Sequence, residues 1–175
     1  FTSFAYIGEI LERTRGKKEI SVDQKLLEEG VKVADWVESI YKIHATAYPA
    51  TFSWEKDYKP RYATEILTPP IAPPPFIHSG KIDSGIFVTI TGIPGLERLY
   101  SEARVLGIKL YSNDIKTVTG SAWALPHIIP NQSTLFQFAR SGWSSVWISM
   151  ISGTPLVVPD FDPKDDPEIY FNNLA

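Results

Sequence analysis

The chain has 175 residues, with 17 Lys and Arg against 20 Asp and Glu and a formal net charge of -3 at pH 7. This near-neutral balance gives no long-range attraction to nucleic acid, and the absence of cysteine excludes a disulfide framework, a thiolate metal site and a cysteine nucleophile. A hydrophobic content of 43% is that of a globular protein with a core, and no apolar run is long enough to span a bilayer. We therefore expect no transmembrane segment and a cytoplasmic location, at most peripheral to a membrane. The chain does not start with Met, which suggests that it begins inside a longer product.

Apolar residues at helical spacing predict a short helix over residues 4–12 and a longer one that starts near residues 21–24. Ser21 and Gln24 fit a capping box at the start of the longer helix. Its pattern runs to the break at Tyr48-Pro49, through Leu27, Val31, Ala34, Ile40, Tyr41 and Ile43. His44, near the end of this helix, is expected to be a cap or surface residue.

Residues 68–75 contain five prolines, which exclude both a helix and a central strand. An extended connector over residues 69–76 is the best candidate for a domain boundary. The sequence then predicts a mostly helical, partial domain over residues 1–68 and a second domain over residues 77–175. The alternative is that the connector wraps over a single core.

Beyond the connector, short β-branched segments alternate with helical ones. Strands are predicted over residues 86–91 and 108–111 around a helix over 94–105, with a weaker strand over 122–129. Residues 135–139 are ambiguous, and a last helix is predicted over residues 168–174 with Pro167 at its first turn. This alternation predicts an α/β fold with a doubly wound, mainly parallel sheet, whose ligands lie beyond the carboxyl ends of the strands.

Residues 139–159 have the layout of an anion site. A small, glycine-bearing turn runs into an apolar helical segment, Gly153 stops it, and a short strand over residues 156–158 follows. The N-terminus of a helix offers unpaired backbone N–H groups and the positive end of the helix dipole. The predicted guest is a phosphate or a diphosphate.

This segment also resembles a known family. Arg140-Ser141-Gly142, Gly153-Thr154-Pro155, Asp166 and Tyr170-Phe171-Asn172 fall where GT-B glycosyltransferases carry corresponding residues in their donor-binding half. The resemblance is to the peptidoglycan lipid-intermediate N-acetylglucosaminyltransferase and related glycolipid synthases, and Ile90 to Gly95 looks like the first turn of that donor domain. It implies a Rossmann-like donor domain behind a partial acceptor-side domain.

The activity that the resemblance implies is transfer of a sugar from a nucleoside-diphosphate sugar, UDP-linked, to the hydroxyl of a lipid-linked or small-molecule acceptor. It implies no tightly bound cofactor and no protein-bound metal, and the three histidines lie too far apart in sequence for a metal-binding motif. The sugar would meet Glu168 and Asp166, and the base would meet Trp123 and His127. The resemblance assigns the donor diphosphate to Arg140, Ser141, Gly142, Ser144, Ser145 and Gly92.

Three departures from the family keep alternatives open. Ile148 stands where the family has a Glu for the ribose hydroxyls, the span from Pro130 to Arg140 is short, and the residues before Pro69 are too few for a whole acceptor domain. A degenerate binding half that complements a partner chain is therefore the alternative function. An epimerase of the same fold would need buried carboxylates near the diphosphate. Arg140 could also be a surface ion-pairing residue, and the serines could be turn and cap residues.

Overall fold

The computed structural model describes residues 4–47, 59–60, 62–68, 80–90, 95–159 and 167–174. It divides into two compact units, which we call unit 1 (Phe1–Ile71 with Phe161–Ala175) and unit 2 (Ala72–Asp160). The division falls within the expected connector over 69–76, whose residues lie outside the described ranges. The C-terminal segment, which we had expected in the second domain, belongs to unit 1.

Unit 2 is built on a five-stranded parallel sheet with the order β5-β4-β3-β6-β7. The first strand of the unit is central, two later strands extend the sheet on one side, and the last two extend it on the other. This order is that of Rossmann-like sheets, so the predicted parallel α/β architecture is confirmed. The strands are β3 (Gly85–Val88), β4 (Lys109–Ser112), β5 (Ala122–Trp123), β6 (Thr134–Phe138) and β7 (Leu156–Val157).

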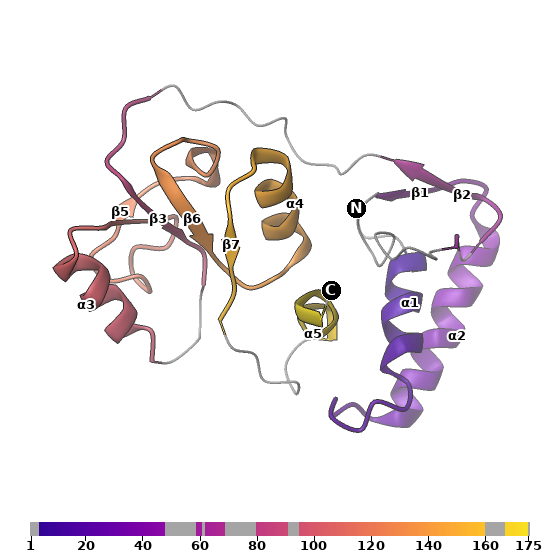
Figure 1. Cartoon of the computed structure of the whole chain (residues 1–175). Helices are drawn as coiled ribbons and strands as arrows, with labels where there is room; N and C mark the ends of the chain where they lie inside the picture. The colour runs from indigo at the N-terminus through magenta and orange to yellow at the C-terminus, as the bar shows by residue number, and fades with distance from the viewer. Residues whose placement is uncertain are drawn as a thin grey trace. The chain divides into compact units, whose positions relative to one another are not determined.

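Two helices cover opposite faces of this sheet, as Figure 1 shows. Helix α3 (Glu97–Val105) joins β3 to β4, and α4 (Trp143–Ser152) joins β6 to β7. Right-handed crossovers that lead in opposite directions from the central strands place their helices on opposite faces. On the α3 face Ile86, Val88, Leu110 and Phe138 pack with α3 residues, and on the α4 face Phe87, Tyr111, Ile128, Ile129 and Ile148 pack together.

The sequence predicted the strand–helix–strand unit at β3 and β4 closely, and the later strands less well. The prediction of a strand over residues 122–129 was wrong beyond Trp123, because Pro126 begins the short 3-10 helix η1 (Pro126–Ile128) instead. The ambiguous residues 135–139 supply most of β6, which lies between β3 and β7. The approach of β3 to β4 requires Gly85, since a Cβ there would collide with the carbonyl oxygen of Lys109.

The described residues of unit 1 form three helices and a small parallel sheet. Helix α1 (Phe4–Thr14) packs on α2 (Gln24–Ile40), and β1 (His44–Ala47) pairs with β2 (Glu65–Thr68). Helix α5 (Pro167–Leu174) is held by its buried Phe171, which packs with Ile20, and by the Tyr170 hydroxyl, which donates to Glu19 at 2.9 Å. No helix in the described part of the chain has the length and apolar character needed to cross a bilayer.

Two predictions for α2 were wrong. Asp23 caps the helix by accepting from the N–H groups of Lys25 and Leu26, so Ser21 is not the capping residue. The helix also ends at Ile40, which is 59% exposed, and the predicted continuation becomes a turn and the strand β1.

Candidate functional site

The candidate site lies where β3 and β6 end, at the carboxyl edge of the parallel sheet. From this pair of strands the chain order runs in opposite directions across the sheet, with β4 and β5 on one side and β7 on the other. Backbone pairing continues just past the strands, since Thr89 N–H donates to Phe138 and Ala139 N–H donates to Val157, at 3.0 and 3.1 Å. Open α/β sheets bind their ligands at such a switch point.

A tight turn carries the chain from β6 into α4. Ala139 and Ser141 are buried, and Gly142 adopts an extended conformation as the N-cap of the helix. The Gly142 carbonyl accepts from the N–H groups of Ser145 and Val146, at 2.9 and 3.1 Å. Gly142 brings no side-chain oxygen to the first turn, where a Ser, Thr, Asp or Asn would cap it, so the helix N-terminus suits an anion.

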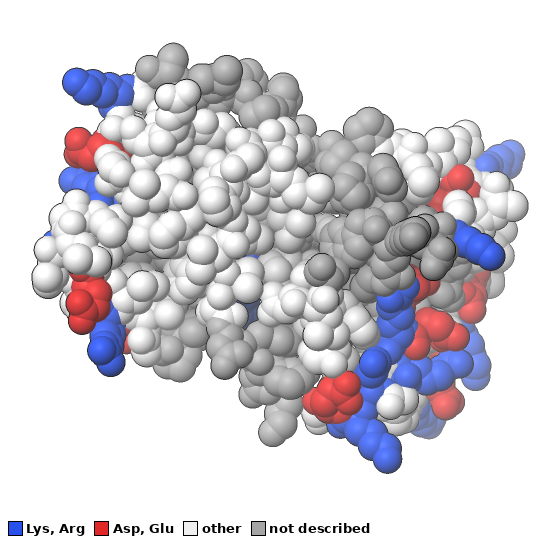
Figure 2. Space-filling model, in the orientation of Figure 1, with Lys and Arg blue, Asp and Glu red and all other residues white. Residues whose placement is uncertain are grey.

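Arg140 is the only charged residue, counting Asp, Glu, Lys and Arg, between Lys116 and Asp160 in the sequence. It is partly buried, and it forms no ion pair with any residue in the described ranges. Figure 2 shows the same asymmetry, because the charged side chains on the visible face of unit 2 gather along its left margin. A single guanidinium in an uncharged stretch, directly before a helix N-terminus, is well placed to bind an anionic group.

The serines of α4 divide between the sheet and the surface. Ser149 is buried and donates to the side-chain oxygen of Gln137 in β6 at 3.1 Å. Ser144 is exposed and Ser145 is partly buried, both in the first turn of the helix. The large apolar residues Met150 and Ile151 are 52% and 37% exposed, whereas the small polar residue Ser149 faces the sheet.

Ile148 belongs to the core of unit 2. It is partly buried and packs against the cluster on the α4 face, which includes Phe87 and Tyr111. The residue that replaces the expected ribose-binding Glu therefore fills a packing position.

The structure brings the residues from Arg140 to Ser145 together, and places Trp123 and His127 elsewhere. Trp123 ends β5 at the far side of the sheet, separated from β6 by β4 and β3, and is 62% exposed. His127 is exposed in η1, and the next carbonyl, of Ile128, accepts from Thr134 at the start of β6. The η1 segment is thus directed toward the amino edge, away from the turn at Arg140.

Three expected residues cannot be located at the site. Gly92 and Asp166 lie outside the described residues, and the same is true of the Glu168 side chain, whose backbone belongs to α5 in unit 1. Their roles, and the base-binding roles of Trp123 and His127, stay predictions.

Two polar residues at the carboxyl edge were not singled out from the sequence. The hydroxyl of Thr89, just after β3, is buried and has no hydrogen-bond partner in the described part of the chain. Asp114, after β4, accepts from the N–H groups of Lys116 and Thr117 and from the Thr117 hydroxyl. The Thr117 hydroxyl, followed by the backbone bonds, lowers the pKa of Asp114, and this carboxylate is thereby committed to its own turn. A polar residue within two positions of a strand end is the signal that could have identified both.

No group of three or more His, Cys, Asp or Glu among the described residues could hold a metal ion. Comparisons of the chain with protein-family models, with curated proteins and with solved structures gave no match. The strand order of unit 2 shows a Rossmann-like α/β fold. Its function has to be inferred from the residues of the candidate site.

Proposed function

We propose that the protein is a glycosyltransferase whose unit 2 binds a nucleoside-diphosphate sugar, UDP-linked, with the diphosphate on the turn from Arg140 to Ser145. The observation that carries the proposal is the position of Arg140. Arg140 is the one charged residue between Lys116 and Asp160. It lies at the switch point of the sheet, directly before the N-terminus of α4, which has no side-chain cap.

In the proposed reaction the oxygen of an acceptor hydroxyl attacks the anomeric carbon of the sugar, and the hydroxyl proton is released to solvent. The bond from that carbon to the diphosphate oxygen breaks, and negative charge develops on the departing diphosphate. Backbone N–H groups at the start of α4 and the guanidinium of Arg140 are preorganised to stabilise that charge. The hydroxyls of Ser144 and Thr89 are further possible donors, Ser144 because it is exposed in the first turn and Thr89 because its hydroxyl lacks a described partner.

Isothermal titration of the intact chain with UDP tests the proposal. We expect Arg140→Ala to weaken binding by about 10- to 150-fold, the equivalent of a charge-assisted hydrogen bond. Lys81→Ala is the matched control, since this exposed cation precedes β3 at the opposite edge of the sheet. Absence of heat with UDP, or equal affinities for the two variants, contradicts the proposal.

A second candidate is a non-catalytic nucleotide-sugar-binding half that complements a partner chain. The core position of Ile148 favours it, because the ribose then lacks the carboxylate that the resembling family supplies. The sheet of unit 1 favours it too, because only two parallel strands are described there, and Ile66 and Leu67 of β2 are both exposed.

A UDP-release assay on a panel of UDP-sugars separates the two candidates. Turnover that Arg140→Ala abolishes supports the transferase. Binding of UDP without turnover of any UDP-sugar, with and without an added lipid-linked acceptor, supports the binding half.

A further inference from the structure

Helix α2 carries two sets of residues at helical spacing, one buried and one exposed. The buried residues of the helix are Leu27, Val31, Ala34 and Glu38. The exposed large apolar residues, which we call the α2 stripe, are Leu26, Val33, Trp36 and Ile40. They are between 54% and 66% exposed. At 3.6 residues per turn the stripe occupies an arc of about 80° that is turned away from the buried face.

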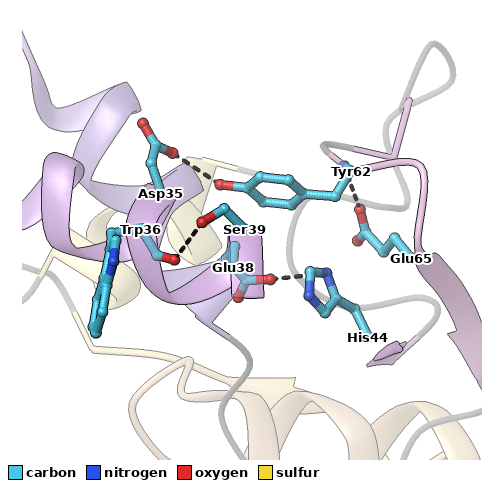
Figure 3. Close-up of polar contacts among 7 residues, drawn as sticks. All are labelled: Asp35, Trp36, Glu38, Ser39, His44, Tyr62 and Glu65. Atoms are coloured by element: carbon cyan, nitrogen blue, oxygen red, sulfur yellow. Dashed lines mark hydrogen bonds and ion pairs between the residues drawn. The ribbon is translucent and has the colours of Figure 1, made fainter. Parts of the chain in front are cut away.

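The buried face of α2 includes a contact with β1. Oε2 of Glu38 lies 2.8 Å from Nδ1 of His44, the first residue of β1, and both side chains are buried (Figure 3). In the same view Trp36 points away from this pair, and it is 64% exposed. The α2 stripe therefore stays open to solvent in the single chain.

The area of the α2 stripe suits one half of a specific interface. Large apolar side chains present roughly 150–250 Å² when fully exposed, so four that are more than half exposed present about 450 Å². Apolar patches of a few hundred Å² mark interaction surfaces. Two stripes face to face would bury about 900 Å², which becomes about 1,400 Å² with a polar rim, because roughly two thirds of a homodimer interface is apolar. This total lies within the range of specific interfaces, about 1,200–2,000 Å².

The spacing of the stripe fits a second helix. Leu26, Val33 and Ile40 follow one another at intervals of seven residues, and Trp36 lies three residues after Val33. These are the a and d positions of a heptad, whose side chains interlock with those of a facing helix. Two heptads are too short to associate as free peptides, but α2 is already held in unit 1 by α1. A second copy of the chain supplies a helix with the same stripe, and a two-fold axis buries the same residues in both copies.

Two charges on the stripe side of α2 select the direction of the second helix. Glu29 and Lys32 are exposed, and they form no ion pair within the described part of the chain. Glu29 occupies a d position, so parallel pairing would place it next to Glu29 of the second copy. Antiparallel pairing centred near Val31 instead places Glu29 beside Lys32 of the second copy. The same register sets Leu26 opposite Trp36, and each contact occurs twice because the axis is two-fold.

We propose that the protein forms a homodimer in which the α2 stripes of two copies pack antiparallel around a two-fold axis. Apolar contact supplies the affinity, and Glu29 and Lys32 fix the direction and the register. The surface belongs to unit 1, whereas the proposed nucleotide site belongs to unit 2. The dimer is therefore tested by mass without nucleotide, and its failure would leave the proposal of UDP binding untouched.

Sedimentation equilibrium of the intact chain, at concentrations from about 1 to about 500 µM, tests the dimer. We expect the mass to rise from that of one chain to that of two over this range. Trp36→Lys places a charge in the contact and should weaken association by about 30-fold or more, as the loss of a tryptophan hot spot does. A single-chain mass of the unmodified protein at every concentration, or a dimer that Trp36→Lys leaves unchanged, overturns the proposal.

Val105→Lys is the matched control, since it makes the same kind of change at a residue of α3 that is 82% exposed. It should alter association by about twofold or less. Circular dichroism should be the same for both variants and the unmodified chain, because both positions are exposed. Leu26→Lys should act as Trp36→Lys does, and it decides the question if the tryptophan variant does not fold.

A charge swap tests the direction of the helices. Glu29→Lys and Lys32→Glu each bring like charges together and should weaken the dimer by about fivefold or more. The double variant restores opposite charges across the axis and should associate within about twofold of the unmodified chain. Glu28→Lys, the same change at an exposed position outside the stripe, controls for net charge and should alter association by about twofold or less. Weakening in the double variant that equals the product of the two single effects contradicts the antiparallel arrangement.

Discussion

Ser149 of α4 donates a hydrogen bond of 3.1 Å to the side-chain oxygen of Gln137 in β6, and both residues are buried. The bond fastens the helix to the strand that precedes it, on the face where Ile148 meets the core. The first turn of α4 and Arg140 are therefore held at the end of β6 by contacts one to two turns further along the helix. A rigid support of this kind is what a preorganised anion site needs.

The Ser149–Gln137 bond can be tested by Ser149→Ala. We expect the variant to lose about 1–3 kcal/mol of unfolding free energy, because the buried amide of Gln137 loses its partner. Urea unfolding measures the loss, and Ser144→Ala is the matched control, since it makes the same change at an exposed position of the same helix. Both variants make the same change of side chain in one helix, and a loss confined to Ser149→Ala reports the buried bond. Equal stabilities would show that the bond contributes nothing.

Ile148 and Met150 offer a test of which face of α4 is core. Ile148→Glu places a carboxylate among apolar residues and should cost about 3 kcal/mol or more, whereas Met150→Glu, at a position that is 52% exposed, should cost about 0.5 kcal/mol or less. Thermal unfolding and titration with UDP are measured on both variants. A stable Ile148→Glu variant with tighter UDP binding would instead place residue 148 in the nucleotide site.

The buried pair of Glu38 and His44 in unit 1 should show strong coupling in a double-mutant cycle. We expect His44→Leu to cost about 3–5 kcal/mol, because it leaves the buried carboxyl group of Glu38 without the imidazole that faces it. The double variant Glu38→Leu, His44→Leu should recover much of that loss, since neither polar side chain then has to be buried. Chemical unfolding of the four proteins gives the coupling energy, and additive single losses would exclude a direct interaction.

Asp114 provides a prediction about pH. Hydrogen bonds from Thr117, chiefly that of its hydroxyl, lower the pKa of Asp114, so the ionised carboxylate favours the folded state. The contribution is present above the pKa of the unfolded chain and is lost as the pH falls through the lower pKa of the folded state. Thr117→Val should raise the pKa of Asp114 toward its ordinary value, as measured by carboxyl NMR titration. Thr119→Val, at an exposed position of the same loop, should leave that pKa unchanged.

The sequence by itself determined the elements whose signals are local. The strand–helix–strand unit at β3, α3 and β4 follows from β-branched and helical periodicity, and Gly153 ends α4 in the left-handed conformation, with φ of 71°. The turn from Arg140 into α4 was also readable, because small residues before an apolar helical segment are a local pattern.

The tertiary structure decided what depends on distant partners. Residues 135–138 were ambiguous until pairing with β3 and β7 made them part of a central strand, and α5 joined unit 1 because its Phe171 packs with Ile20. His44, expected as a cap or surface residue, is buried against Glu38, because the chain turns after Ile40 and brings β1 back onto α2. Periodicity records which side of an element is apolar, whereas the partner that covers that side is fixed only when the whole chain has folded.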